Sequence, residues 1–357
     1  MSVPPLYARW LAEALPEALP SEPLATCDHC AMCSSSGDAD EEFFSARTKC
    51  CTFFPDLPSF LVGRLLGDGS AEMAQGRARV EERIEAGAGV TPLGVLAPPQ
   101  YRLQYRIAEP AFGRSTALRC PYYREEDGQC GIWLHRISTC CTWFCKHQRG
   151  AVGLRFWAAL KELLRGVERA LACWCLLELG FDPAALAECQ AARREARKQL
   201  DAPSLDGHAD HARQARIWGS WHGRERQLYE ECGELVAGLS WRDVRTAGGA
   251  TVALLERICV DAYQRHSDTQ IPDHLQTDRM ALVGVQAETA RVATYSAYDP
   301  VEIPRAVLDL LHHFDGRPTM DVLEEIRTQK EVELEPELLR LLVDFEVLVD
   351  PHPKEKV

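Results

Sequence analysis

Ten of the fifteen cysteines in this chain are grouped in two clusters within its first 145 residues. The remaining five occur singly in helical patterns, where cysteine is expected to pack as a small apolar side chain. Grouped cysteines in irregular segments are instead typical of metal binding. The predicted metal ligands are Cys27, Cys30, Cys33, Cys50 and Cys51 in the upstream cluster, and Cys120, Cys130, Cys140, Cys141 and Cys145 in the downstream cluster.

The spacing within the upstream cluster indicates which metal centre to expect. Cys27, Cys30 and Cys33 have the C-x2-C-x2-C spacing by which ferredoxin-type loops bring three thiolates to one 4Fe–4S cluster. The fourth thiolate of such loops is remote and precedes a proline, as Cys120 precedes Pro121. Structural zinc normally uses two separate C-x2-C hooks. We therefore predict an iron–sulfur cluster of the 4Fe–4S type, one or two in number, with Zn²⁺ as the alternative.

Adjacent cysteines and nearby histidines leave the ligand assignment open. Side chains of neighbouring residues diverge, so each adjacent pair either serves two neighbouring sites or leaves one thiol spare. Ten thiolates would supply two four-ligand sites with two left over. His29, His135 and His147 lie in the same segments and are possible additional ligands. A histidine satisfied by a backbone carbonyl is the commoner case for each of them.

The composition and charge of the chain indicate its cellular compartment and argue against some classes of partner. The 357 residues carry 40 basic and 53 acidic side chains, which gives a net charge of -13. A nucleic-acid or anionic-membrane binder would need a basic face, so neither partner is expected. The N-terminal sequence has no secretory pattern, and the most apolar run is too short to span a bilayer. We expect a cytoplasmic protein, in which grouped cysteines point to metal or catalysis rather than disulfides.

The downstream cluster resembles a known family. Its pattern C-P-[YF]…G-x-C-x-I-[YW]-x-x-R…C is similar to that of the YkgJ-type cysteine-cluster proteins, described as zinc- or iron-chelating. The matching residues are Cys120, Pro121, Tyr122, Gly128, Cys130, Ile132, Trp133, Arg136 and Cys140 or Cys141. The resemblance covers residues 25–150 and extends distantly to flagellin lysine N-methylase, which is thought to carry an iron–sulfur cluster. It implies metal binding, and we carry over no methyl transfer. In that family the upstream motif is usually C-x2-C-x2-C-C, whereas sixteen residues separate Cys33 from Cys50 here.

The elements that must position these cysteines are mostly helices. The apolar periodicity predicts a mainly α fold with an irregular cysteine-rich metal-binding module, residues 21–150, a helical domain, residues 151–278, and a small α+β winged-helix unit, residues 279–357. Helices are expected at 7–15, 59–86, 152–179, 183–200, 208–238 and 241–266, with a weak point at Gly248-Gly249 in the last and a strand at 101–107. Asp182-Pro183 is a helix-start signal.

The C-terminal sequence has the order of elements of a winged helix. A hairpin is expected over 280–285 and 289–295, followed by helices opening at Pro304, capped by Thr319 and opening at Pro336, then a closing strand at 345–349. The third helix is acidic, so DNA reading is not expected. The segment resembles the PqqD-like winged helices that hold a leader peptide on a hairpin edge. A peptide or protein partner is therefore predicted, with a structural cap as the alternative.

Two classes of function remain open from the sequence. One is an iron–sulfur enzyme acting by redox or Lewis-acid chemistry on a peptide or protein. The other is a non-catalytic protein with structural zinc, or one that handles metal. No catalytic residue is identified. The acids Glu162, Glu168 and Glu178 on the long helix are interpreted as ordinary solvated glutamates.

Overall fold

The computed structural model describes residues 3–33, 43–198 and 211–352. The chain divides into two compact units. The first unit contains Met1–Pro20, Thr26–Trp143 and Leu160–Ile258, and the second contains Ser21–Ala25, Phe144–Ala159 and Cys259–Val357. These ranges do not follow the boundaries at 150 and 278 that the sequence suggested. Each unit is considered by itself.

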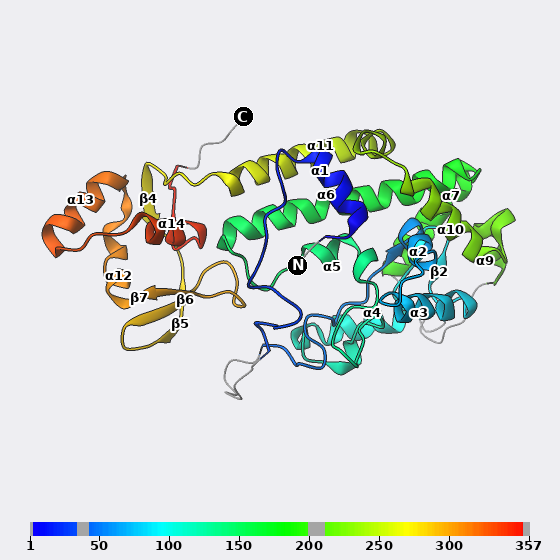
Figure 1. Cartoon of the computed structure of the whole chain (residues 1–357), viewed down its shortest axis with the longest axis horizontal. Coiled ribbons are helices and arrows are strands. Elements are labelled where there is room, and N and C mark those ends of the chain that lie inside the picture. The colour runs from blue at the N-terminus through cyan, green and yellow to red at the C-terminus, as the bar shows by residue number, and fades with distance from the viewer. Residues whose placement is uncertain (1–2, 34–42, 199–210, 353–357) are drawn as a thin grey trace. The chain divides into compact units, whose positions relative to one another are not determined.

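Helices dominate the structure, which confirms the predicted mainly helical class (Figure 1). The first unit holds α1 (Pro5–Ala14), α2 (Ser59–Leu66), α3 (Ala74–Glu85), α4 (Pro99–Ile107), α5 (Ser138–Thr142), α7 (Pro183–Lys198), α9 (His211–Trp218) and α10 (Glu225–Ala237). Two long helices, α6 (Gly150–Glu178) and α11 (Trp241–Ser267), contribute residues to both units. A small antiparallel sheet has the order β1-β3-β2, from Leu57–Pro58, Gly94–Val95 and Val90–Thr91.

Close packing of α2 against α10 organises the first unit (Figure 1). A Cβ atom built at Gly63 would lie 1.7 Å from the carbonyl oxygen of Tyr229, and one at Gly233 would lie 2.9 Å from the carbonyl carbon of Gly63. Only glycine allows the two backbones to approach this closely. In the core beside this contact, the side chains of Phe60, Leu61 and Leu65 are at most 1% exposed.

Local sequence signals correctly predict several of these helices. The helix expected over 152–179 is α6, and its apolar face, including Leu160 and Leu164, is fully buried. Asp182 caps α7 as predicted, since its Oδ2 accepts hydrogen bonds from the backbone N–H groups of Ala184 (3.1 Å) and Ala185 (3.3 Å). Helix α11 is kinked at Gly249, where φ is 57° and ψ is -150°, at the predicted weak point.

Three expectations from the sequence are wrong. The strand expected at 101–107 is helix α4, because Pro99 occupies a first-turn position and Tyr101 stacks on Tyr105 one turn later. The helix expected over 59–86 is two helices, α2 and α3, separated at Gly67. The helix expected over 208–238 is divided into α9, a 3-10 turn at Gly219–Trp221 and α10, and its residues 208–210 lie outside the described residues.

The second unit contains two three-stranded sheets. One has the order β8-β4-β9, from Asp315–Pro318, His274–Thr277 and Leu348–Val349. The other has the order β5-β6-β7, from Ala281–Val285, Thr289–Ala293 and Val301–Pro304. Helices α12 (Arg305–Leu308), α13 (Thr319–Lys330) and α14 (Pro336–Asp344) complete the unit. The side chains of Leu275, Ile303, Val322 and Leu342 meet in its core.

The expected hairpin and helices of the tail are present, with two corrections. The closing strand predicted over 345–349 is shorter, β9 at Leu348–Val349, and pairs with β4. Thr319 does not cap α13 with its side chain, because its hydroxyl donates to the carbonyl oxygen of Pro272 at 2.9 Å. Strand β5 forms a sheet edge, since its single described strand partner is β6.

None of the helices within the described ranges combines the length and the hydropathy that crossing a membrane requires.

Candidate metal centre

The structure brings cysteines from both clusters around one cavity in the first unit. The backbone N–H of Cys120 donates to the carbonyl oxygen of Cys51 at 2.8 Å, which joins the two segments directly. The cavity has a volume of about 240 Å³. The cysteines that line it are Cys27, Cys50, Cys51, Cys120, Cys130 and Cys140.

A tight turn sets the positions of two of these sulfurs. Tyr123 and Cys130 form an antiparallel bridge, and the N–H of Gly131 donates to the carbonyl oxygen of Tyr122 at 2.7 Å. Gly128 closes the turn at φ 68°, a left-handed conformation that favours glycine. The charged stretch between Cys120 and Cys130 therefore folds back on itself and directs both cysteines toward the cavity.

Lys49 connects the upstream loop to this turn. Its Nζ donates to the carbonyl oxygens of Cys27 at 2.6 Å and Gly128 at 2.9 Å, and the side chain lines the cavity. The backbone of Lys49 is left-handed, with φ 48°, which costs a non-glycine residue about 1 kcal/mol. Sequence reasoning missed Lys49, because nothing in the pattern of one lysine before a cysteine pair indicates where its amine lies.

Arg136 is the second cation at the cavity. Its side chain is buried, its Nε donates to the carbonyl oxygen of Trp133 at 3.0 Å, and its guanidinium carbon lies 3.5 Å from the centre of the Trp133 ring. A guanidinium stacked on an indole in this way is held in one orientation. The rings of Phe112 and Trp143, whose centroids lie 5.5 Å apart, also line the cavity.

Burial disfavours the thiolate form of the cavity cysteines. Burial raises the pKa of Cys27 and of Cys130 to about 11 each. A hydrogen bond with Cys51, followed by burial, holds the pKa of Cys50 well above its ordinary value. The positive charge of Arg136 acts in the opposite direction on Cys130, since it favours the thiolate. The thiols would therefore need a strong cation to ionise together, as metal ligation provides.

The adjacent pair Cys140-Cys141 is divided between two environments. Cys140 lines the cavity, whereas the buried thiol of Cys141 donates to the carbonyl oxygen of Ser138 at 3.4 Å within α5. Of this pair, only Cys140 is therefore placed at the cavity. Both members of the other pair, Cys50 and Cys51, line the cavity.

The helix that carries Cys140 is held by Glu168 of α6. The Glu168 carboxylate accepts hydrogen bonds from the backbone N–H (2.5 Å) and the hydroxyl (2.9 Å) of Ser138 and from the hydroxyl of Tyr7 (2.7 Å). Burial raises the pKa of this carboxyl. The interpretation of Glu168 as a solvated glutamate was wrong. Its position one turn after Leu164, on the buried face of the helix, was the available signal.

The other predicted ligands lie elsewhere. Cys30 and Cys33 are not among the residues lining the cavity, and burial, followed by the charge of Cys30, raises the pKa of Cys33 to about 12. His29 is exposed at the surface. Cys145 belongs to the second unit.

Two histidines already have polar partners. His135 is buried, with its Nε2 2.7 Å from Oδ2 of Asp68, and its pKa is lowered by burial. His147, in the second unit, is buried with its Nδ1 3.3 Å from the hydroxyl of Tyr295, and burial lowers its pKa to about 4. Within the described ranges, no three His, Cys, Asp or Glu side chains converge to hold a single metal ion.

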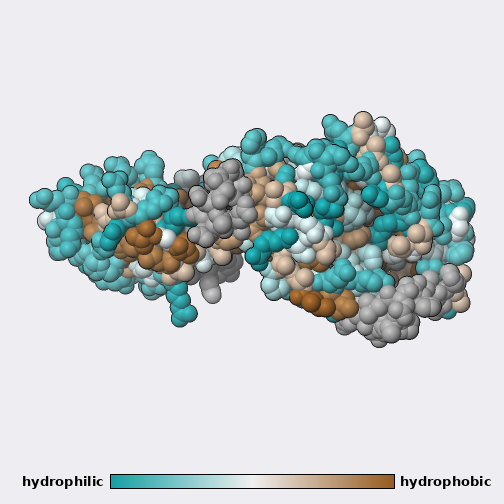
Figure 2. All heavy atoms as spheres, turned by 90° about the horizontal axis from the view of Figure 1, so that it is seen from below, coloured by the Kyte–Doolittle hydropathy of each residue, from teal (hydrophilic) through white to brown (hydrophobic). Residues whose placement is uncertain are grey.

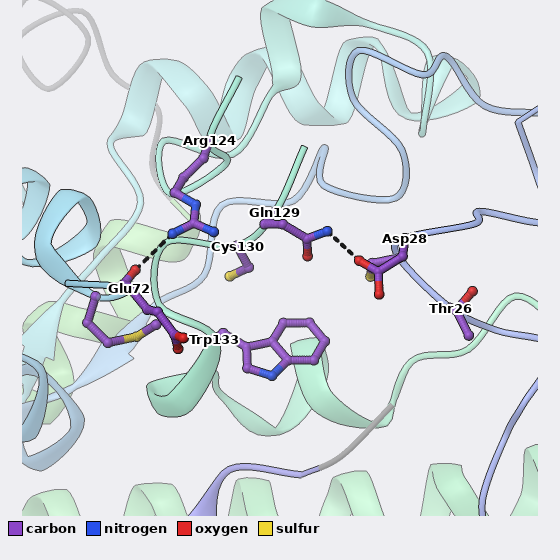
Figure 3. Close-up of a pocket in the computed structure, with 9 residues that line it drawn as sticks. Thr26, Asp28, Glu72, Arg124, Gln129, Cys130 and Trp133 are labelled. Carbon is purple, nitrogen blue, oxygen red and sulfur yellow. Dashed lines mark hydrogen bonds between the residues drawn. The ribbon is translucent and has the colours of Figure 1, made fainter. Parts of the chain in front are cut away.

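A second, outer pocket of about 360 Å³ adjoins the cysteine cavity (Figure 3). Cys27, Cys130 and Trp133 line both spaces. Polar groups surround the outer pocket: Gln129 donates to Asp28, and Nη1 of Arg124 donates to the carbonyl oxygen of Glu72 at 3.1 Å (Figure 3). A small reactant in the outer pocket would therefore lie against two of the cavity cysteines.

Comparison of the chain with models of protein families, with curated proteins and with solved structures finds no match. The resemblance to the YkgJ-type proteins therefore stays a prediction from its motif residues. Of these, Cys120, Gly128, Cys130, Ile132, Trp133, Arg136 and Cys140 line the cysteine cavity.

Proposed function

We propose that the first unit binds one iron–sulfur cluster of the 4Fe–4S type through four of the six cavity cysteines, and that the protein is a redox or cluster-dependent modification enzyme acting on a peptide or protein. The observation that carries this proposal is the gathering of six cysteines, drawn from both sequence clusters, around one cavity. Such a donor set of soft thiolates suits an iron–sulfur cluster or zinc.

The size of the cavity favours a cluster over a single zinc ion. Four sulfurs bound to one zinc ion at about 2.3 Å lie only about 3.8 Å from each other, which leaves room between them for that ion alone. The cavity here, at about 240 Å³, is large enough for a group of several atoms. Aromatic walls from Phe112 and Trp143 would limit water around it, which is a common means of setting a cluster's potential.

The outer pocket adjoins the cysteine cavity, which supports a chemical rather than a structural role for a metal centre there. Cys27, Cys130 and Trp133 separate the two spaces and line both. When bound through four thiolates, an iron–sulfur cluster would supply electron transfer at this wall. The residues around the outer pocket would bind and orient the reactant there.

Anaerobic purification tests the metal assignment. We expect a brown protein that contains iron and acid-labile sulfide in the ratio of one cluster per chain. Metal analysis, sulfide analysis and the visible absorption spectrum give the measurement. A colourless protein with stoichiometric zinc and no sulfide, even after cluster reconstitution, would contradict the proposal and favour the structural-zinc alternative.

The edge strand β5 is proposed as the peptide-binding element of a winged-helix-like second unit. Its outer edge can pair with an extended peptide through backbone hydrogen bonds. Leu282, Val283 and Val285 are 55%, 54% and 53% exposed, so apolar peptide side chains would find partners there. Hydrophobic side chains gather on this part of the second unit (Figure 2).

Replacing Val283 by lysine is expected to abolish peptide capture. A charged side chain blocks strand addition at an edge, and an exposed position tolerates it without unfolding. Selection from a phage-displayed random peptide library should enrich extended apolar sequences on the wild-type chain and not on V283K. Equal enrichment on both chains, or a wild-type dimer that V283K dissociates, would show that the edge does not serve a peptide. The matched control is M320K, a substitution at an exposed position of α13.

A further inference from the structure

The cysteine cavity contains two fixed cations and, among the described residues that line it, no carboxylate. Lys49 and Arg136 are the cations, and the remaining lining side chains are cysteines, aromatic residues and small neutral groups. The two side chains therefore bring fixed positive charge to the cavity.

Both cations are held in place by the same segments that carry the cysteines. The ammonium group of Lys49 bridges the carbonyl oxygens of Cys27 and Gly128 at 2.6 and 2.9 Å. The guanidinium of Arg136 is fixed between the Trp133 ring and two carbonyl oxygens, those of Trp133 at 3.0 Å and Cys140 at 3.5 Å. Neither group needs to reorganise for its charge to act on the cavity.

We propose that Lys49 and Arg136 are positioning residues that raise the reduction potential of the cluster. This inference rests on the proposed iron–sulfur site. A cluster held by four thiolates is anionic and becomes more so when it accepts an electron, so a fixed positive charge stabilises the reduced form more than the oxidised form. Arg136 is buried and Lys49 is half-buried, which limits the screening of their charges by salt. The cluster is thereby suited to accept electrons.

Redox titration of the anaerobically purified full chain, followed by visible absorption, tests this inference. The variants K49Q and R136Q each remove one charge, and K49Q keeps an N–H₂ donor for the two carbonyls. We expect each to reduce the equilibrium constant for one-electron reduction at least tenfold, which is a potential lower by about 59 mV. The variants K49R and R136K keep the charge and should stay near the wild-type potential. The matched control is R47Q, which removes an exposed charge two residues from Lys49.

The outcomes separate this inference from the proposal on which it rests. Wild-type protein without iron and sulfide contradicts the cluster itself. A full cluster in K49Q and R136Q at the wild-type potential overturns only the tuning role. If both neutral variants lose iron, recovery of iron in K49R and R136K supports the need for positive charge, and failure to recover it overturns the inference.

Discussion

Replacing Cys27, Cys120 and Cys130 together by serine is expected to abolish iron binding. Cys27 comes from the upstream cluster and the other two from the downstream cluster, and their removal leaves three of the six cavity cysteines, Cys50, Cys51 and Cys140. A cluster that needs four thiolates cannot then be completed. Because metal binding supplies folding free energy, the loops that carry the cysteines should also become sensitive to protease.

A second triple variant provides the control. Cys141, Cys173 and Cys189 also belong to the first unit but do not line the cavity. Each sulfur makes a hydrogen bond that a serine hydroxyl can make: Cys141 with the Ser138 carbonyl oxygen at 3.4 Å, Cys189 with that of Ile217 at 3.8 Å, and Cys173 with Gln190 Nε2 at 3.1 Å. The control should retain the iron content of the wild type.

Iron and sulfide content of the two triple variants, purified anaerobically side by side, provides the measurement. Full iron in the cavity variant would show that the cluster lies elsewhere. Loss of iron from the control alone would place a ligand among cysteines that do not line the cavity.

Truncating Glu168 to alanine is expected to lower the free energy of unfolding by about 3 kcal/mol or more. The change leaves three buried donors, the Tyr7 hydroxyl and the N–H and hydroxyl of Ser138, without their acceptor. An unsatisfied buried polar group costs about 1–3 kcal/mol. Because Ser138 begins the helix that carries Cys140, iron content should fall as well.

Replacing Glu168 by glutamine separates the hydrogen bonds from the charge. The amide can keep all three partners if the Ser138 hydroxyl accepts instead of donating, so stability at neutral pH should stay within about 1 kcal/mol of the wild type. Burial raises the Glu168 pKa above its ordinary value of 4.5. Wild-type stability from this group is therefore greatest at low pH and declines as pH rises from 4.5 through the folded-state pKa. E168Q should lack that decline.

Denaturant unfolding of wild type, E168A and E168Q across pH 4 to 8 checks both expectations, with E162A as the control. Glu162 lies on the same helix but is exposed and pairs with Arg165 at 3.4 Å, so its removal should change stability by no more than about 0.5 kcal/mol. A pH slope in E168Q identical to that of the wild type would show that Glu168 does not titrate as a buried acid.

The sequence alone determined the features that depend on neighbours along the chain. The apolar period of 152–179 specified α6, the Asp182-Pro183 pair specified the start of α7, and the glycine pair before residue 250 specified the kink in α11. The candidate cysteines were also identified from their types and grouping, because cysteines gathered in irregular segments have few roles other than metal binding.

Other features depended on contacts between distant residues, which only the tertiary structure decided. The hydroxyl of Tyr101 in α4 donates to the carbonyl oxygen of Thr52 at 2.8 Å, which joins this helix to a distant segment. Pairing of β9 with β4 joins residues more than seventy positions apart. Neither contact has a local signal, because the partner of a strand or of a helix side chain is supplied from elsewhere in the chain.

The candidate site shows most clearly the difference between what the sequence determined and what the tertiary structure decided. Its cysteines were present in the sequence, but the position of Cys140 at the cavity, with its neighbour Cys141 turned away, follows from the direction in which α5 is held by Glu168. Lys49 is likewise held by the carbonyl oxygens of two distant residues, and Arg136 is held by the ring of Trp133. Residue type decides what a side chain can bind, whereas the direction of each side chain is fixed by packing and hydrogen bonds between segments far apart in the sequence.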